Sequence, residues 1–131
     1  MSMLIGSMNR PKLLSDLLVR EVEPEISRET ITVLAGSGTD RVLSMGTVVG
    51  KITASGEIVA LTPGASDGSQ TAWGVVLDDV TAPVGTDATG LAFANGPVLL
   101  RAEAIVWPAG ISDADKNAAI AALAAKLIKI R

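Results

Sequence analysis

The glycine-rich segment Gly36-Ser37-Gly38-Thr39-Asp40 is the nearest approach in this sequence to a phosphate-binding loop. A Walker loop requires four residues between its first two glycines, followed by Gly-Lys-Ser or Gly-Lys-Thr. This segment has a single Ser between Gly36 and Gly38, and no lysine follows them. Because glycine and serine are typical turn residues, we interpret the segment as a β-turn.

Asp78 and Asp79 are the candidates for paired catalytic or metal-binding carboxylates. Adjacent residues on a strand point to opposite faces of a sheet, so these two side chains are not expected to converge on one substrate. Mg²⁺ and Ca²⁺ sites also need several convergent oxygen ligands. We therefore predict no metal site.

Three serines, Ser37, Ser44 and Ser66, carry hydroxyl groups that could act as nucleophiles. The sequence has no histidine and no cysteine, which removes the commonest general base and the thiolate nucleophile. A Ser–Lys dyad with Lys51 stays open, although no motif supports it. We predict that the protein is not an enzyme and needs no cofactor.

The composition predicts one domain that associates with other proteins. The 11 Lys and Arg against 14 Asp and Glu give a net charge of −3, which argues against a nucleic-acid partner. Apolar residues make up 48% and charged residues 19%, below the usual ~25% charged. Contacts between copies of the chain would cover the apolar surface this implies. The alternative is that alanine, which is tolerated on surfaces, accounts for the apolar fraction.

No run of about 18 apolar residues occurs, so we predict no membrane-spanning segment. The first ten residues also do not resemble a secretory signal. We expect synthesis in the cytoplasm.

Charged residues and leucines concentrate in residues 1–29, which we expect to form an arm distinct from a body at residues 30–131. Pro11 could stand in the first turn of a helix, and Pro24 ends the pattern. A helix of this length is marginal alone, so it must dock on its own domain or on another chain. Its apolar positions recur at helical spacing and are Leu13, Leu14, Leu17, Leu18 and Val22.

Short runs of β-forming residues separated by glycines predict a mostly β body with minor helix. Glycines inside strands commonly mark bulges or sharp bends, so we expect a bent ribbon rather than a flat sheet. The runs lie at residues 30–34, 42–53, 58–61, 73–80, 90–94 and 98–106.

The end of the chain carries the clearest helix signal. Ser112 is predicted to cap the helix, with Asp115 as the third helical residue, and residues 127–130 alternate as in a final strand. Trp73 and Trp107 are expected to be core or interface anchors, and Pro108 ends the preceding strand. The apolar positions at helical spacing are Ile120, Leu123, Ala124 and Leu127.

Four segments, in this order and spacing, resemble the lambda-type head decoration proteins of tailed bacteriophages. They are LSDLLVREV with ISRETITVL at residues 14–22 and 26–34, MGTVVGKI at 45–52, DGSQTAWGVVL at 67–77 and IVWPAGIS at 105–112. The resemblance implies a β-clip-like body with a short Ala-rich helix near the C-terminus. It also implies a homotrimer at local three-fold sites of the expanded head, with the arm gripping the major capsid protein.

The leading hypothesis is therefore a structural virion protein at the capsid surface, made in the host cytoplasm. We expect residues 1–29 to be dispensable for folding of the body and required for attachment to the capsid. Two alternatives stay open at this point. One is a binding module of a phage tail or baseplate, and the other is a trimeric β-fold nucleotide hydrolase.

Overall fold

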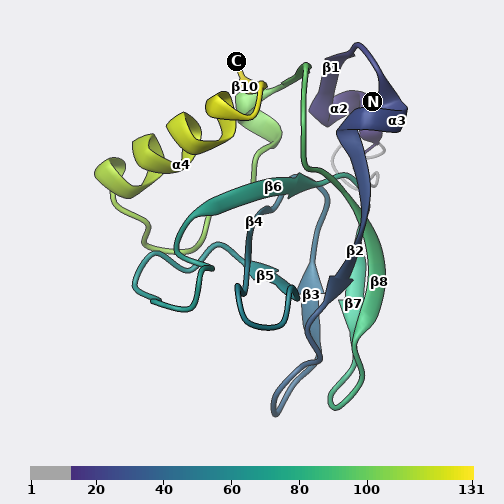
Figure 1. Cartoon of the computed structure of the whole chain (residues 1–131), viewed down its shortest axis with the longest axis vertical. Helices are drawn as coiled ribbons and strands as arrows, with labels where there is room; N and C mark the ends of the chain where they lie inside the picture. The colour runs from purple at the N-terminus through teal and green to yellow at the C-terminus, as the bar shows by residue number, and fades with distance from the viewer. Residues whose placement is uncertain (1–12) are drawn as a thin grey trace, which may run out of the picture.

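The computed structural model describes residues 13–131, whose strands are arranged in three groups (Figure 1). Five strands close into a barrel in the order β2-β5-β4-β6-β8: Arg28–Val33, Ile58–Ala60, Val48–Lys51, Ala72–Val76 and Ala88–Phe93. Strands β3 (Arg41–Leu43) and β7 (Val80–Ala82) form an antiparallel pair. The third group is a sheet in the order β1-β9-β10: Leu18–Glu21, Val98–Leu100 and Ile128–Ile130.

The helices are short except for the last one. They are α2 (Leu14–Leu17), α3 (Pro24–Ser27), the 3-10 helix η1 (Ala102–Ala104) and α4 (Asp113–Ala125). No helix in residues 13–131 is long and apolar enough to cross a membrane.

The mostly β class is confirmed, and the bent strands close into a barrel. Strand β4 shows how a glycine bends the barrel wall, because its register with β6 shifts between Val49 and Gly50. A side chain on Gly50 would overlap the backbone of Ser69. Only glycine allows this close approach, which brings the loop before β6 against β4.

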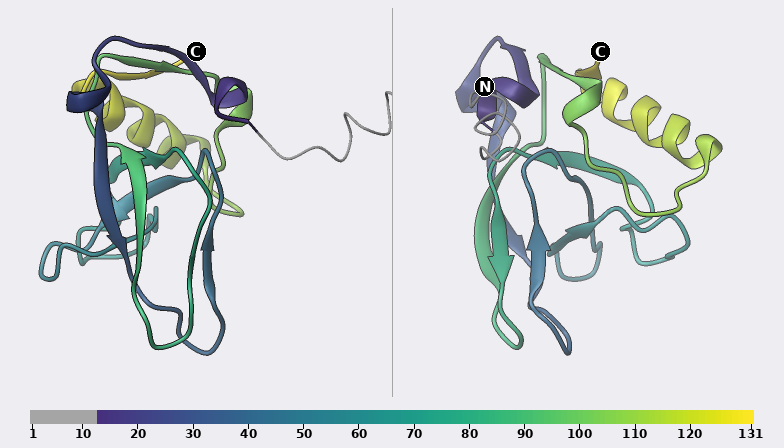
Figure 2. Two further views of the ribbon diagram at one scale, coloured as in Figure 1. Left: turned by 90° about the vertical axis from the view of Figure 1, so that its right-hand side faces the viewer. Right: turned by 180° about the vertical axis from the view of Figure 1, so that it is seen from behind.

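Two apolar cores hold these elements together. The first lies between the barrel and the layer formed by α4 and the β1-β9-β10 sheet, which sits at one end of the molecule (Figure 2). It includes Leu17 from α2, Phe93 from β8, Leu123 from α4 and Ile128 from β10, none of them measurably exposed. The second core packs barrel residues against the β3–β7 pair.

The helix predicted over the leucine-rich segment was wrong beyond one turn. Helix α2 ends at Leu17, and the chain continues as β1, which pairs antiparallel with β9. Backbone pairing with β9 replaces the helical hydrogen bonds, so tertiary contacts override the local pattern. Pro11 and the rest of residues 1–12 lie outside the described residues.

The five apolar residues of the segment have different environments. Leu17 is buried, Leu14 and Leu18 are half-buried against the same core, and Leu13 and Val22 are exposed. The boundary predicted between residues 29 and 30 falls inside β2. Removal of residues 1–29 would uncover the first core, which revises the expectation that this segment is dispensable for folding.

The chain end follows the prediction up to Ala125. The Ser112 hydroxyl accepts a hydrogen bond from the Asp115 backbone amide at 3.1 Å, which caps α4 as expected. The predicted stripe fails at Leu127, since the helix ends first and Leu127 is exposed. The final strand is confirmed as β10. The strand predicted over residues 98–106 was too long, because β9 ends at Leu100 and η1 follows.

Substitution of Leu17 by alanine should reduce the free energy of unfolding by about 2–5 kcal/mol, the usual range for a buried leucine. Leu13→Ala is the matched control, because Leu13 is 54% exposed and its loss should cost about 0.5 kcal/mol or less. Urea unfolding followed by circular dichroism measures both. Equal effects of the two substitutions would contradict the placement of Leu17 in the core.

Candidate interaction surfaces

A buried ion pair fixes the start of the described chain on the barrel. The Glu21 side chain on β1 is only 5% exposed, and its carboxylate oxygen lies 2.7 Å from Arg28 Nη2 at the start of β2. The Ser27 hydroxyl donates to the same carboxylate at 2.6 Å. The Arg28 guanidinium in turn lies over the Phe93 ring, 5.8 Å from its centroid. This cluster links the β1-β9-β10 sheet to the barrel.

The same contacts set the charge state of Glu21. The hydrogen bonds from Arg28 lower the pKa of the Glu21 carboxyl below its ordinary value, burial opposes this effect, and the bond from Ser27 adds to it. The pKa of Arg28 is raised, first by its hydrogen bond to Glu21. Both groups are therefore charged at neutral pH.

The outer face of the β1-β9-β10 sheet carries an apolar groove, which we call the sheet-face groove. Its volume is about 200 Å³. Val22 at its wall is 60% exposed and Leu127 is 52% exposed, so large apolar side chains here face solvent. The lining residues are Arg20, Val22, Pro97, Val98, Leu99, Leu127 and Lys129.

Leu127 has a backbone conformation that leucine rarely adopts. Its φ is +65°, in the left-handed region that favours glycine, and leucine pays about 1–2 kcal/mol there. The exposed side chain recovers little of this cost by burial within the chain. Leu127 directly follows the C-cap residue of α4, where a left-handed residue commonly ends a helix, and its exposed side chain lies in the groove.

Two further apolar residues of the predicted arm, Val19 and Ile26, are also exposed. At the other end of the molecule the loops β2–β3 and β7–β8 project side by side (Figure 2). Val42 on β3 and Val84 in the second loop are both more than half exposed there, and we call these two residues the hairpin surface.

The remaining predicted site residues lie outside the sheet-face groove. Trp107 is half-buried against the first core, with Lys116 Nζ 5.6 Å from its ring centroid. The carbonyl of Pro108 accepts a hydrogen bond from the Ile111 amide at 3.2 Å, which forms the turn before α4. Trp73 is half-buried on β6, between Lys51 and Lys126.

The residues considered for catalysis have other contacts. Asp78 and Asp79 lie in the turn between β6 and β7, not on a strand as assumed. The Asp79 carboxylate accepts the Met45 backbone amide at 2.7 Å, and the Asp78 carboxylate accepts the Asp79 amide at 2.9 Å. Within residues 13–131 no group of three acidic side chains is placed to hold a metal ion.

Sequence reasoning found Val22 but missed the other residues of the groove. Its strands come from three distant parts of the chain, and β10 pairs with β9 in parallel. The alternation of residues 127–130 predicted a strand and so placed Lys129 opposite its apolar neighbours. No local pattern in the sequence predicted that Arg20 or Pro97 would lie next to Lys129.

The family model described as bacteriophage lambda head decoration protein D matches residues 7–128, nearly the whole chain. None of the curated proteins matches the sequence.

Glu21→Gln should lower the free energy of unfolding at pH 7 by about 1–3 kcal/mol, because a charged hydrogen-bond acceptor is lost. The pKa of Glu21 is lower in the folded chain than its ordinary value of 4.5. Its contribution is therefore complete above that value and is lost as the pH falls through the lowered pKa. The difference from the wild type should shrink with acid.

Urea unfolding at several pH values measures this difference. Glu25→Gln is the matched control, since Glu25 is exposed and precedes Ser27 on the same short helix. A difference between Glu21→Gln and the wild type that stays constant from neutral to acidic pH would contradict a stabilising role for the Glu21 charge.

Proposed function

This chain belongs to the bacteriophage lambda head decoration protein D family, and we propose that it binds the expanded phage head as a homotrimer at local three-fold sites and stabilises the shell. The family is one of structural proteins of the phage capsid, so a place on the virion follows from membership. The proposal adds that the chain is made in the host cytoplasm before it joins the head.

The sheet-face groove is the observation that carries the proposal. It is apolar, solvent-facing and flanked by Arg20 and Lys129, and exposed apolar surface of this kind marks protein interaction sites. We propose that the major capsid protein contacts the groove and the arm at residues 1–29. Leu13 and Val22 of the predicted arm are available for that contact, because both are exposed.

The other three apolar residues predicted for the arm have a different role. Leu17 is buried and Leu14 and Leu18 are half-buried, so they hold the segment on the barrel. The arm then presents its exposed residues from a fixed base rather than docking as a free helix. A preorganised surface loses less conformational entropy on binding.

Trimer formation would multiply weak contacts of this kind. Each leucine-sized side chain contributes about 1.5–3 kcal/mol when fully buried. Three linked copies on one trimer raise the effective concentration of the second and third contacts. A shell protein can therefore be held firmly by surfaces that are individually modest.

We expect sedimentation to give the mass of a trimer at micromolar concentration. We propose that the trimer interface uses the barrel and includes the hairpin surface, so Val84→Asp should yield monomers that retain their circular dichroism spectrum. A stable monomer of the wild-type chain would contradict the trimer, and a trimeric Val84→Asp variant would remove the hairpin surface from the interface.

Leu127→Gly should separate stability from capsid binding. Glycine relieves the left-handed backbone, so stability should be unchanged or rise by up to about 1 kcal/mol. The groove loses an exposed apolar side chain, so occupancy on expanded, undecorated heads should fall about tenfold or more at equal protein concentration. Electron cryo-microscopy of the mixed particles measures the occupancy.

Leu91→Ser is the control for this experiment, because it removes an exposed leucine outside the groove. It should leave the occupancy unchanged. Full occupancy by Leu127→Gly would exclude the groove as the capsid contact, whereas failure of the wild-type chain to bind heads would overturn the function itself.

A further inference from the structure

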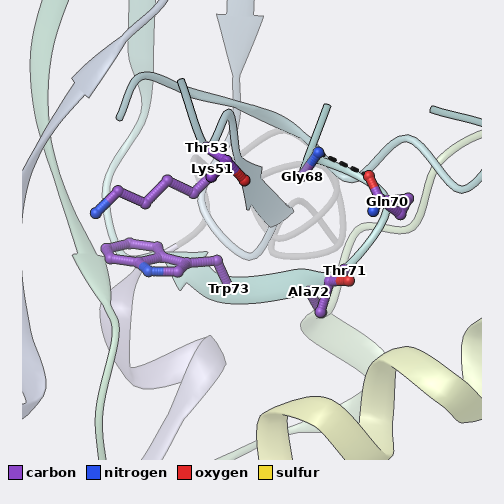
Figure 3. A pocket seen from close by; sticks show the side chains of 7 residues that line it. All are labelled: Lys51, Thr53, Gly68, Gln70, Thr71, Ala72 and Trp73. Atoms are coloured by element: carbon purple, nitrogen blue, oxygen red, sulfur yellow. Dashed lines mark hydrogen bonds between the residues drawn. The ribbon is translucent and has the colours of Figure 1, made fainter. Parts of the chain in front are cut away.

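A second hollow, of about 540 Å³, opens beside Trp73 and shares no lining residue with the sheet-face groove (Figure 3). We call it the Trp73 pocket. Its floor is apolar and its rim carries hydroxyl, amide and ammonium groups. The lining residues are Lys51, Thr53, Gly68, Gln70, Thr71, Ala72 and Trp73, and five of them belong to the DGSQTAWGVVL segment.

The wall of the pocket is held by a tight loop. Gly68 has a φ of +110°, and a side chain there would overlap the Thr53 hydroxyl and the Lys51 carbonyl. The Asp67 carboxylate accepts the Ser69 amide at 3.0 Å, which turns the loop. These contacts give the pocket a defined shape without a ligand, and preformed shape is typical of binding sites.

The rim offers hydrogen-bond donors. The Gln70 side-chain carbonyl accepts the Gly68 amide at 2.8 Å (Figure 3), so the Gln70 NH₂ group is the part of that side chain left for a ligand. Thr53 and Thr71 add hydroxyl groups, and Lys51 adds an ammonium group. No acidic residue lines the pocket, so the lining suits a ligand that is negatively charged and rich in acceptors.

Two lysines share the Trp73 ring. Lys51 Nζ lies 5.3 Å and Lys126 Nζ 4.6 Å from the ring centroid, and Lys126 Nζ also donates to the Trp73 carbonyl at 2.6 Å. Neither lysine forms an ion pair with another residue of the described range 13–131. Two ammonium groups therefore lie against one indole ring, and Lys51 is the one that lines the pocket.

The charge on Lys126 is costly in the isolated chain. Burial lowers the pKa of Lys126, Glu29 opposes this effect, and the positive charge of Lys51 lowers the pKa further. An anion beside Lys51 would oppose the repulsion between the two ammonium groups.

We propose that the Trp73 pocket binds a carboxylate, presented as an Asp or Glu side chain by a neighbouring protein of the assembled head. A carboxylate provides acceptors for the Lys51 ammonium and the rim hydroxyls, and the methylene groups that carry it match the apolar floor at Ala72 and Trp73. The neighbour is either another copy of this chain or the capsid protein, because both can supply the same chemistry.

Titration of the isolated chain with N-acetyl-glutamate amide tests the pocket at constant ionic strength. The two indole N–H signals in a ¹⁵N-labelled sample report the two tryptophans, and Trp73→Phe assigns them. We expect a saturable shift of the Trp73 signal with a midpoint in the millimolar range. Lys51→Gln should weaken this binding about tenfold or more, and Lys51→Arg should restore it.

Lys116→Gln is the matched control, because Lys116 stands over Trp107 at 5.6 Å as Lys51 stands over Trp73. It should leave the response of Trp73 unchanged. A linear shift, an equal response in Lys51→Gln, or equally strong saturation by inorganic phosphate would overturn the assignment of a carboxylate site.

The assembled particle identifies the neighbour. Loss of the trimer mass in Lys51→Gln would identify another copy of this chain, and reduced occupancy on heads with the trimer intact would identify the capsid protein. If Lys51→Gln changes neither the trimer mass nor the occupancy, the proposal that a protein supplies the carboxylate is wrong. Failure of the wild-type chain to decorate heads would overturn only the proposed function, because the titration uses the chain alone.

Discussion

One apolar side of the barrel is covered by the two ends of the described chain together with β9 and η1. Phe93, the single phenylalanine, is completely buried in the core that also contains residues of α2, β9, β10 and α4. The burial of this surface fixes where β1 and β10 lie, and their pairing with β9 creates the outer sheet face. The ion pair of Glu21 and Arg28 stands at the edge of the same contact, where Arg28 also covers the Phe93 ring. The sheet-face groove therefore depends on this packing.

Features that depend on contacts between residues close in the sequence were predicted correctly. The cap of α4 needs only Ser112 and the amide of Asp115, three residues apart, and that prediction is confirmed. The segment at residues 13–22 has a helical pattern of leucines, but β9 offers it backbone partners some eighty residues away. Intrinsic propensity is a weak prior where a strand can pair in this way. The end of β9 at Leu100 was missed for a related reason, because η1 follows it without a glycine or proline to mark the change.

The Trp73 pocket and the sheet-face groove differ in how much of each could be predicted from the sequence. The DGSQTAWGVVL segment carries most of the Trp73 pocket, so its tight loop and its tryptophan were visible as a motif. Lys126 reaches the same ring from the end of α4, 53 positions further along the chain, and no spacing rule predicts that contact. The sheet-face groove is harder still, because Val22, Pro97 and Leu127 meet only after β10 has paired with β9. Leu127 itself was assigned to the buried stripe of α4, and its left-handed backbone turns it outward instead.

The position of β10 in the first core has a consequence during synthesis on the ribosome. Ile128 is fully buried, and it completes a core that also contains Leu17 from the start of the described chain. The nascent chain cannot close this core until β10 has emerged from the exit tunnel. Until then β9 lacks one of its two partner strands, and the first core stays incomplete. Closing a loop this long is slow compared with local folding, so the first core closes only after β10 has been synthesised, and chaperones can act on the open core in that interval.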